Sequence, residues 1–489
     1  MASLTCEQMR QLEKQAFENG ATPGQLMDLA GAGIARAILL RYPECGTAIA
    51  CIGSGNNGGD ALVALRHLAD AGWSISVRIA HQPTQLAALP RKKWRELGSC
   101  PVNENPELLG KGPLVILDGL LGIGAAGPLR APIAVLAQWI NEQRQHAGAD
   151  VIAMDMPSGV NGDTGEVYTD AVKADLTLTV GVPKCGLFAD QAVNHVGAIE
   201  TIPISELTVE GDASTTLNDL HSLSGILPRR PHDFHKGNAG RVGIVAGSPG
   251  MLGAAVLCAT GALRGGAGLV TLFVHESIYP LISPMLPPEV MVRIVRDLSE
   301  VLEEKLDALA IGPGMGMTGG DPFVKLLDNC AVPMVLDADA LNRIASDGLE
   351  KHLRANMLLT PHPGEMARLF PEYSQMPRAE AARVFCQQHP GVTLLLKGAR
   401  TIITDDSGPV FVNGTGHAGM ASGGQGDTLS GVIAGLLAQG LSTVEAARMG
   451  AWLCGRAAEL AVSHGKNSRQ SLTASDVSSW LGMAFRELK

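Results

Sequence analysis

Short apolar runs alternate with amphipathic stretches along residues 47–204, and the runs are rich in Val, Ile and Leu. The six runs are TAIACIG, WSISVRIA, LVILDG, DVIAMD, ADLTLTVG and GAIETIPI. Unbroken apolar runs of this length are typical of strands buried on both faces of a parallel sheet, and the stretches between them have the spacing of covering helices. The pattern predicts a doubly wound α/β domain.

The same alternation begins again after residue 225. Eight apolar runs follow: RVGIVAGS, AGLVTLFV, ALAIGPG, VPMVLDAD, NMLLTPH, TLLLKG, TIITDD and PVFVN. Between the two series, residues 205–225 lose the apolar rhythm and gain Ser, Thr, Asp and Gly, as a domain boundary does. A chain of 489 residues is also too long for one ordinary core. We therefore expect α/β domains at 1–210 and 225–489 with a linker at 211–224, and no internal duplication.

Composition and charge exclude several classes of protein. The net charge is −10 and no basic stripe is evident, which argues against binding of nucleic acid or anionic membranes. Apolar runs break long before about 20 residues, and the first 20 residues form a charged amphipathic pattern without a signal-peptide core. The nine cysteines include no C-x-x-C pair, so we expect reduced, buried thiols in a cytoplasmic protein.

The glycine-rich segment GSGNNGGD at 53–60 joins the first apolar run to an amphipathic stretch. Its glycines fit the G-x-G-x-x-G fingerprint of a dinucleotide-binding turn. A nicotinamide-dependent dehydrogenase also needs an acidic residue about 20 residues on, at the end of the second strand, to hold a ribose. That strand ends instead in HQP, and Asp70 falls on the preceding helix. The segment therefore does not predict a simple dehydrogenase.

Polar side chains also follow two later strands of this domain. Asp118 ends LVILDG, and Asp155 ends DVIAMD with Ser158 in the turn that follows. Ligands of open α/β sheets bind above the carboxyl ends of the strands, so these turns and Asn57 are expected on one edge. Oxygens from Asn57, Asp118 and Ser158 suit a hard monovalent or divalent cation, which leaves Asp155 to move a proton. The alternative for each Asp is a helix cap or turn residue.

Two more features complete the candidate site of the first domain. The glycine-rich loop at 122–128 presents backbone amides that suit a phosphate. Lys184 comes just past the strand in TLTVGVPKCGL and is either a solvated lysine or a phosphate or catalytic contact.

Taken in order and spacing, GSGNNGGD, LDGLLGIG, MDMPSG and VGVPKCGL resemble the NAD(P)H-hydrate epimerase domain over roughly residues 1–210. The resemblance implies a Rossmann-like fold that binds the hydrated dinucleotide as substrate, and a potassium ion at Asn57, Asp118 and Ser158. It implies substrate contacts at Asn56, Asn57, Gly58, Gly59, Asp60, Gly122, Ile123, Gly124, Ala125, Ala126, Gly127, Pro128 and Asp155. Ala61 departs from the family, which often has another glycine there; we expect no consequence. Asp155 and Lys184 are the candidate catalytic residues.

The second domain lacks a G-x-x-x-x-G-K-[ST] loop, which excludes a P-loop nucleotide site. Instead, GMASGGQGDTLSG runs from a glycine-rich loop directly into a helix, where consecutive amides form an anion cradle. Asp427 is the carboxylate in this cradle. An acidic group beside a phosphate site repels the ligand unless it serves as a base or binds a metal. The alternative is an Asp that caps the helix, although the glycines at 423, 424 and 426 exceed what a cap needs.

This turn resembles that of the ribokinase-like fold, in which the Asp deprotonates a substrate hydroxyl beside the nucleotide phosphates. With HKGNAGRVGIVAGSPGMLGAA, IGPGMG, TPHPGEMARL and LLLKGARTII it resembles the ADP-dependent NAD(P)H-hydrate dehydratase over 225–489. The resemblance implies substrate contacts at Ala254, Gly314, Gly316, His362 and Asp427, and nucleotide contacts at Lys397, Gly398, Ala399, Arg400, Thr401 and Gly426. His362 could instead cap a helix and Lys397 could be solvated. Asp337 and Asp339 end a strand and could orient a magnesium ion through water.

The combined resemblance implies a bifunctional repair enzyme. It would epimerise R- and S-NAD(P)HX and dehydrate the S form to NAD(P)H, with ADP converted to AMP and phosphate. We expect potassium in the first domain, magnesium in the second, and a homo-oligomer that binds neither nucleic acid nor membrane. The alternative is a ribokinase-type small-molecule kinase with a non-catalytic N-terminal binding module.

Overall fold

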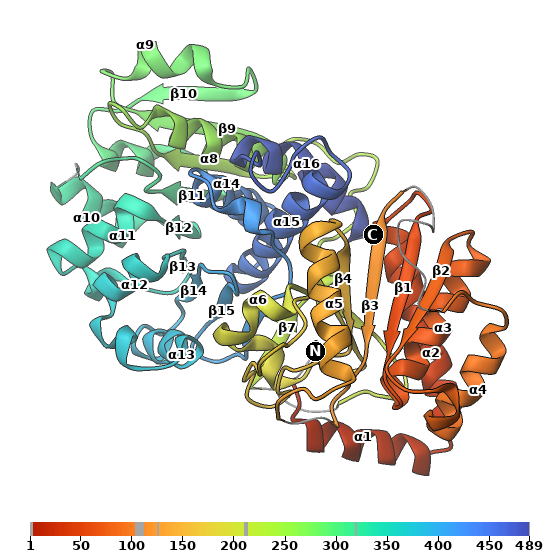
Figure 1. Ribbon diagram of the computed structural model, residues 1–489. Helices are drawn as coiled ribbons and strands as arrows, with labels where there is room; N and C mark the ends of the chain where they lie inside the picture. The colour runs from red at the N-terminus through yellow and green to blue at the C-terminus, as the bar shows by residue number, and fades with distance from the viewer. Residues whose placement is uncertain (1–2, 103–111, 125–126, 210–213, 318–319, 489) are drawn as a thin grey trace. The chain divides into compact units, whose positions relative to one another are not determined.

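The chain forms two compact α/β units, Met1–Leu217 and Asn218–Lys489 (Figure 1). The computed structural model describes residues 3–102, 112–124, 127–209, 214–317 and 320–488. The α/β class and the two-sheet organisation expected from the apolar runs are confirmed.

The first unit contains a six-stranded sheet in the order β2-β1-β3-β4-β5-β6, and all of its strand pairs are parallel. Each strand coincides with one of the six apolar runs: β1 (Thr47–Ile52), β2 (Ser74–Ile79), β3 (Leu114–Gly119), β4 (Asp150–Met154), β5 (Leu176–Val180) and β6 (Ala198–Ile202). The order steps outward in both directions from β1, which is the doubly wound arrangement that the sequence predicts.

Helices cover both faces of this sheet, because alternate residues of each strand point to opposite sides. In β1, Ala48, Ala50 and Ile52 pack in one cluster with α2 and α3, whereas Ile49 and Cys51 pack in another with α5 (Figure 1). The helices are α1 (Cys6–Glu18), α2 (Pro23–Arg41), α3 (Asn56–Asp70), α4 (Ala88–Leu97), α5 (Ile133–His146) and α6 (Val193–Val196).

The second unit contains a ten-stranded sheet in the order β10-β9-β8-β11-β12-β13-β14-β15-β16-β7. Its strands are β7 (Thr215–Asn218), β8 (Arg241–Val245), β9 (Leu269–Val274), β10 (Val290–Ile294), β11 (Ala308–Ile311), β12 (Met334–Leu336), β13 (Met357–Leu359), β14 (Thr393–Leu396), β15 (Ile402–Thr404) and β16 (Val410–Asn413). The pairs from β10 to β14 are parallel, and β14–β15 and β15–β16 are antiparallel. This mixed sheet agrees with the ribokinase-like arrangement that the resemblance implied.

The sequence pattern missed the two strands at the edges of this sheet. Edge strands are half-solvated and need no continuous apolar run, and β10 exposes Met291 and Ile294. The strand β7 and the short helix α7 (Leu220–Leu223) lie within the predicted linker 211–224. That segment is therefore partly regular rather than a plain connector.

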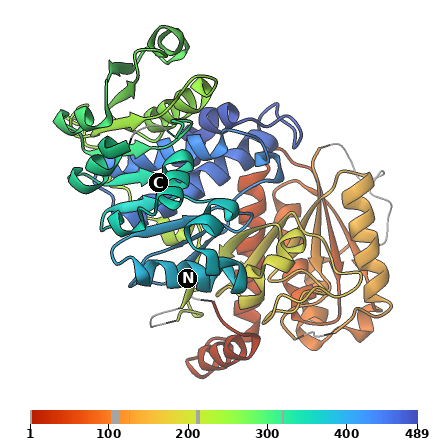
Figure 2. The same cartoon turned by 90° about the vertical axis from the view of Figure 1, so that its left-hand side faces the viewer.

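Helices cover both faces of the second sheet as well (Figure 2). Ala308 and Ala310 of β11 pack with α8, α14 and α15, whereas Leu309 and Ile311 pack with α10 to α13. The helices are α8 (Leu252–Arg264), α9 (Tyr279–Ile282), α10 (Gly320–Asn329), α11 (Ala338–Asp347), α12 (Pro363–Leu369), α13 (Arg378–Gln388), α14 (Gln425–Ala438), α15 (Thr443–Ser463) and α16 (Ala474–Glu487).

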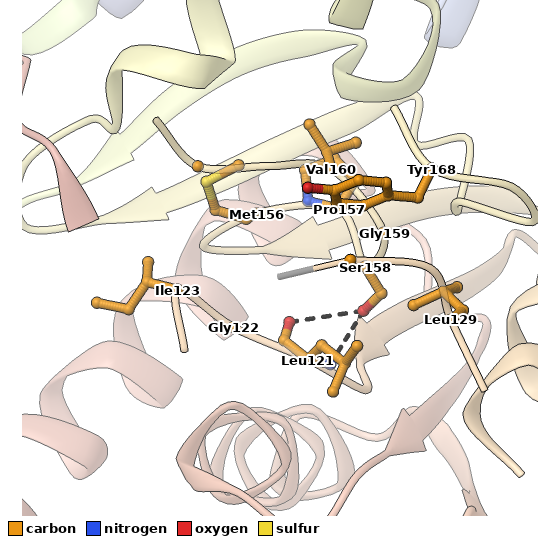
Figure 3. Close-up of a pocket in the computed structure, with 12 residues that line it drawn as sticks. Leu121, Gly122, Ile123, Leu129, Met156, Pro157, Ser158, Gly159, Val160 and Tyr168 are labelled. Carbon is orange, nitrogen blue, oxygen red and sulfur yellow. Dashed lines mark hydrogen bonds between the residues drawn. The ribbon is translucent and has the colours of Figure 1, made fainter. Parts of the chain in front are cut away.

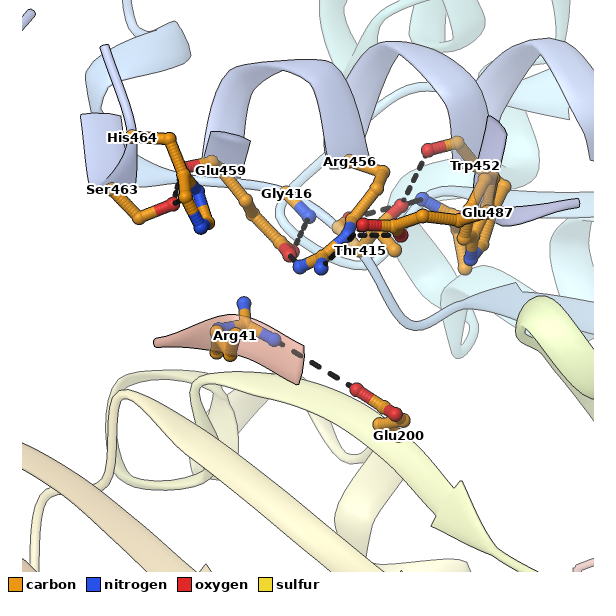
Figure 4. Close-up of polar contacts among 11 residues, drawn as sticks. Arg41, Glu200, Thr415, Gly416, Trp452, Arg456, Glu459, Ser463, His464 and Glu487 are labelled. Atoms are coloured by element: carbon orange, nitrogen blue, oxygen red, sulfur yellow. Dashed lines mark hydrogen bonds and ion pairs between the residues drawn. The ribbon is translucent and has the colours of Figure 1, made fainter. Parts of the chain in front are cut away.

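A buried charge network joins the last two helices (Figure 4). The Arg456 guanidinium of α15 donates to Glu487 of α16 at 2.7 Å and to Glu459 at 2.8 Å, and Glu459 accepts from the Gly416 amide at 2.9 Å. Both carboxylates raise the pKa of Arg456 although burial opposes them. Among the described residues, no helix combines the length and apolarity that a membrane span needs.

Candidate active sites at the two sheet edges

The glycine-rich turn of the first unit is pressed against the end of β3. A Cβ atom on Gly53 would lie 2.0 Å from the Leu120 carbonyl oxygen, so only glycine fits there. The turn leads into α3, which begins at Asn56 after an N-cap at Gly55. The close approach brings Asn57 beside the residues that follow β3.

The three predicted cation ligands of the first unit lie together. Ser158 donates to both oxygens of Asp118, from its amide and from its hydroxyl, each at 2.7 Å. The Leu121 amide donates to Ser158 Oγ at 3.0 Å, and Asn57 Nδ2 donates to the Leu121 carbonyl at 2.8 Å. The backbone of Leu121 thus contacts both Asn57 and Ser158, and Ser158 contacts Asp118. The three side chains lie together at the carboxyl edge of the sheet.

Asp118 is fully buried. Burial raises the pKa of its carboxyl to about 6, although hydrogen bonds from Ser158 and Leu120 act in the opposite direction. No lysine or arginine in the described part of the chain forms an ion pair with it. A buried carboxylate next to amide and hydroxyl oxygens, without a basic partner, is a donor set that fits a bound cation.

Asp155 and Lys184 form a buried ion pair at the next strand ends. Lys184 is 1% exposed, and its ammonium also donates to the Val180 carbonyl at 3.1 Å. Asp155 adopts a φ of 65°, in the left-handed region, and its Oδ1 accepts from the Val180 amide at 3.0 Å. The alternative of a solvated Lys184 is therefore wrong, because the side chain is buried and its ammonium contacts Asp155 and the Val180 carbonyl.

Two further carboxyl groups act electrostatically on this pair. Burial, followed by the charges of Asp155 and Glu13, raises the pKa of Asp60 well above its usual value. Burial and Asp155 likewise raise the pKa of Glu13, which lies on α1. The site thus places the Asp155–Lys184 ion pair near two carboxyl groups with raised pKa values, and the sequence pattern did not single out Glu13.

The loop after β3 lines a small pocket together with the residues that follow β4 (Figure 3). Gly122, Ile123 and Gly127 contribute from the loop, opposite Met156, Ser158 and Tyr168. Arg10 of α1 donates to the Ile123 carbonyl at 3.1 Å, which holds the start of the loop. Gly124 and Pro128 belong to the same loop, whereas Ala125 and Ala126 lie outside the described residues.

In the second unit, Asp427 stands in the first turn of α14, three residues after the N-cap. The N-cap is Gly424, with a φ of 89°, and no side chain caps this helix. Asp427 is half-buried, and its carboxylate forms no hydrogen bond with a described residue, so the capping alternative is wrong. Burial and the charge of Asp337 raise its pKa to about 6, while Lys397 lowers it. These are properties of a group that exchanges a proton near neutral pH.

Lys397 lies between two buried carboxylates. Its Nζ is 2.7 Å from Asp337 Oδ1 and 3.7 Å from Glu365 Oε2. The other oxygen of Asp337 accepts from Ser430 of α14 at 2.8 Å. Ser430 and Glu365 were not singled out from the sequence, although Ser430 follows Asp427 by three residues, on the same helix face.

His362 caps α12, as one of the two alternatives predicted. Its Nδ1 accepts from the amides of Gly364 and Glu365 at 3.0 and 3.3 Å, and its Nε2 lies 3.5 Å from Glu365 Oε1. The ring is half-exposed, so capping does not prevent a contact with substrate.

Ala254 and the loop after β11 are brought together. A Cβ atom on Gly314 would lie 3.0 Å from that of Ala254, and Gly314 has a φ of 58°. The Gly316 amide donates to Asp339 Oδ2 at 2.9 Å. Asp337 is buried and its two oxygens contact Lys397 and Ser430, and the suggested role of Asp337 and Asp339 in orienting hydrated magnesium stays a prediction.

The predicted nucleotide loop is the tight connection from β14 to β15. Gly398 and Ala399 are exposed and Arg400 is buried, and Thr401 Oγ1 donates to the Gly398 carbonyl at 3.1 Å. Gly426 adjoins this loop, because a Cβ atom there would lie 3.3 Å from Lys397 Nζ. The loop, Gly426 and Asp427 therefore share one edge of the sheet.

These sites define a two-unit α/β protein with polar side chains at the carboxyl ends of the parallel strands of each sheet. Residues 23–186 match the family model described as YjeF-related protein N-terminus, and residues 242–480 match that described as NAD(P)H-hydrate dehydratase. The bifunctional NAD(P)H-hydrate repair enzyme Nnr of Coxiella burnetii is 39% identical over 485 residues, with 96% of each chain covered. The enzyme of the same name from Escherichia coli K12 is 33% identical, covering 93% of this chain and 88% of its own.

The chain belongs to the family of bifunctional NAD(P)H-hydrate repair enzymes. Among solved structures, the ADP/ATP-dependent NAD(P)H-hydrate dehydratase of Bacillus subtilis, co-crystallised with ATP and Mg²⁺, is 31% identical. The match covers 56% of this chain and 98% of that one, with a TM-score of 0.49.

Proposed function

We propose that the chain repairs hydrated nicotinamide dinucleotides in two steps. The first unit epimerises R- and S-NAD(P)HX, and the second dehydrates S-NAD(P)HX to NAD(P)H while ADP becomes AMP and phosphate. The observation that carries this proposal is similarity over the full length to bifunctional repair enzymes, together with a polar site in each unit. An epimerase fused to a dehydratase recovers the epimer that the dehydratase does not accept.

In the dehydratase step, Asp427 takes the proton of the substrate hydroxyl. The freed oxygen attacks the β-phosphorus of ADP, AMP leaves, and the lone pair of the ring nitrogen expels phosphate from the carbon that bore the hydroxyl. Phosphorylation makes a poor leaving group a good one. One support is the half-buried carboxylate of Asp427, which has no hydrogen-bonding partner among the described residues. The other is the set of backbone amides at the start of α14 and the ammonium of Lys397, which suit the phosphates of the nucleotide.

The substrate of this unit is placed against Ala254, Gly314, Gly316 and His362, and the nucleotide against Lys397, Gly398, Ala399, Arg400, Thr401 and Gly426. Magnesium fits this site as a companion of the nucleotide phosphates, which it commonly binds in proteins. Among the described residues, no group of three or more His, Cys, Asp or Glu side chains forms a metal cage.

In the epimerase step, Asp155 exchanges a proton with the substrate, and Lys184 pairs with its carboxylate and orients it. Asn56, Asn57, Gly58, Gly59, Asp60 and the loop at 122–128 contact the dinucleotide. Potassium fits at Asn57, Asp118 and Ser158, where Asn57 Nδ2 is engaged by Leu121 and its amide oxygen is left for an ion. When bound, the ion supplies positive charge beside the substrate and orders the two turns.

A cytoplasmic location and a homo-oligomeric state are part of the proposal. The location rests on nine free cysteines, of which six are buried. Binding of nucleic acid or membrane is not expected from an acidic chain.

The test is incubation of the full chain with mixed R- and S-NADHX, ADP and potassium, with NADH absorbance followed to completion. The expected result is full conversion, with one AMP and one phosphate released for each NADH. Conversion that stops when the S epimer is consumed would contradict the epimerase assignment. ATP-dependent phosphorylation of a small alcohol, with no NADH formed, would instead identify a kinase.

A further inference from the structure

The geometry points to Asp337 as a positioning residue of the dehydratase site, which holds Lys397 away from Asp427 and fixes the helix that carries Asp427. This inference rests on the proposed function of the second unit. It concerns a side chain that touches neither the proposed substrate nor the nucleotide, and acts through Lys397 and Ser430.

Asp337 occupies a helix N-cap without capping the helix. It precedes α11 at the N-cap position, where an Asp normally accepts from amides of the first turn, yet its side chain makes no capping hydrogen bond. Instead Oδ1 accepts from Lys397 at 2.7 Å and Oδ2 accepts from Ser430 at 2.8 Å. The carboxylate thus joins the ends of β12 and β14 to α14 rather than stabilising its own helix.

The contact between Asp337 and Ser430 is almost completely shielded from solvent. Asp337 is 1% exposed and Ser430 is fully buried. A buried ion pair is weak as a source of stability, because desolvation of both charges offsets most of their attraction. Burial would raise the pKa of Asp337, but Lys397 and Ser430 hold it below its usual value, so the carboxylate stays charged. The pair is therefore better explained by what it positions than by what it stabilises.

The position of Lys397 decides whether Asp427 can act as a base. A Cβ atom on Gly426 would lie 3.3 Å from Lys397 Nζ and 3.6 Å from Asp337 Oδ2, so the ammonium lies just below the turn that bears Asp427. Without Asp337, the acidic groups left around Lys397 are Glu365, whose Oε2 lies 3.7 Å from its Nζ, and Asp427, whose charge also acts on Lys397. Loss of the Asp337 contact therefore frees the ammonium of Lys397 to move toward Asp427. An ion pair between them would lower the basicity of Asp427 and turn the ammonium away from the nucleotide.

Ser430 is the second hydrogen-bonding partner of Asp337. This residue lies one helical turn after Asp427, and its hydroxyl donates to Asp337. The contact ties the start of α14 to Asp337, one helical turn from Asp427, and so adds to the packing against α8 in setting the direction in which Asp427 faces. A displacement of about 1 Å at a reacting group can cost about 100-fold in rate.

The test compares Asp337→Asn and Ser430→Ala in the full chain, assayed on S-NADHX with ADP. We expect Asp337→Asn to lower kcat by about 100-fold, to raise the KM for ADP, and to move the acid limb of the pH profile to lower pH. Ser430→Ala leaves Lys397 paired, so we expect a smaller loss of kcat with the KM for ADP unchanged. The charged groups that act on Asp427 in this profile are Asp337, Asp339 and Lys397, with Glu365 beside Lys397. The Cys258 thiol on α8 also lies near Asp427, but burial raises its pKa well above the usual value.

Matched controls separate positioning from folding. Asp219→Asn replaces another buried Asp at a helix N-cap, one that does cap its helix, and Ser478→Ala replaces a buried helical serine that bonds only within α16. Epimerase activity and the melting temperature of each variant report folding. The inference is overturned if Asp337→Asn keeps kcat and the KM for ADP within twofold of the parent and leaves the acid limb of the pH profile unmoved. It is also overturned if Asp337→Asn and Ser430→Ala lose no more dehydratase activity than their controls. A parent chain that forms no NADH from S-NADHX would refute the proposed function instead.

Discussion

In the first unit the buried carboxylate of Asp118 accepts hydrogen bonds from Ser158 and Leu120, and no basic side chain within the described residues pairs with it. In the second unit the buried carboxylate of Asp337 lies 2.7 Å from Lys397. Both residues end a parallel strand at the carboxyl edge of a sheet. The pKa moves accordingly, up to about 6 for Asp118 because of burial, and down for Asp337 because Lys397 outweighs burial.

The difference agrees with the two kinds of ligand proposed for the two units. A carboxylate without a basic partner suits a site completed by a cation from solution. A carboxylate already neutralised by a lysine suits a site that must receive a polyphosphate, because an uncompensated negative charge would repel it. The predictions below test this comparison.

Replacement of the proposed base should give the largest effect. Asp427→Asn should lower the rate of dehydration by roughly 10²–10⁴ while epimerisation is unchanged. ADP should bind as tightly or slightly more tightly, since a negative charge near its phosphates is removed. NADH recovery from S-NADHX and calorimetric titration with ADP are the measurements, with Asp405→Asn in the β15–β16 turn as the matched control. Near-normal turnover would refute the assigned role.

Replacement of the unpaired carboxylate in the first unit should weaken the proposed cation site. Asp118→Asn keeps the shape of the side chain but removes its charge, so epimerisation should fall about 10- to 100-fold or require far more potassium. Dehydration of pure S-NADHX should not change. The measurement is the rate of epimerisation against potassium concentration, with choline as the replacement cation. Equal activity of the parent chain without potassium would contradict this prediction.

Acidification should affect dehydration through Asp427. A general base works only when deprotonated, and burial with the charge of Asp337 raises the pKa of Asp427 to about 6. The kcat/KM for dehydration should therefore be constant above this pH and fall about tenfold for each pH unit below it. The profile should be recorded with S-NADHX at a fixed concentration of ADP. A flat profile down to about pH 5 would show that another group accepts the proton.

The position of the domain boundary should give the smallest effect. Residues 1–210 should epimerise and residues 225–489 should dehydrate only the S epimer, but the second fragment lacks β7 and α7. Asn218 Nδ2 donates to Asn413 and to the Arg448 carbonyl at 3.0 and 2.8 Å. A fragment that begins at residue 214 should therefore melt about 5 °C higher than one that begins at 225. Identical melting curves would show that these contacts contribute nothing.

The sequence by itself determined the fold class and which polar residues follow the buried strands. Apolar runs marked all six strands of the first sheet and eight of the ten strands of the second, because strands buried on both faces are unbroken apolar segments. The pattern of apolar runs did not predict the edge strands β7 and β10, because half-solvated strands need no unbroken apolar segment. Asn57, Asp118 and Ser158 were predictable as neighbours because the carboxyl ends of parallel strands share one edge.

Only the tertiary structure decided which of these residues pair. Lys397 is 60 residues from Asp337, and Ser430 is 93 residues from it, so neither contact follows from local spacing. The same carboxylate could have capped α11 or faced a hydrated ion, and all three outcomes agree with the pattern VLDADALN. The order of β12, β13 and β14 in the sheet and the packing of α14 against it bring Lys397 and Ser430 to Asp337. Burial then removes the water that would otherwise satisfy the charge, and this makes the pairing specific.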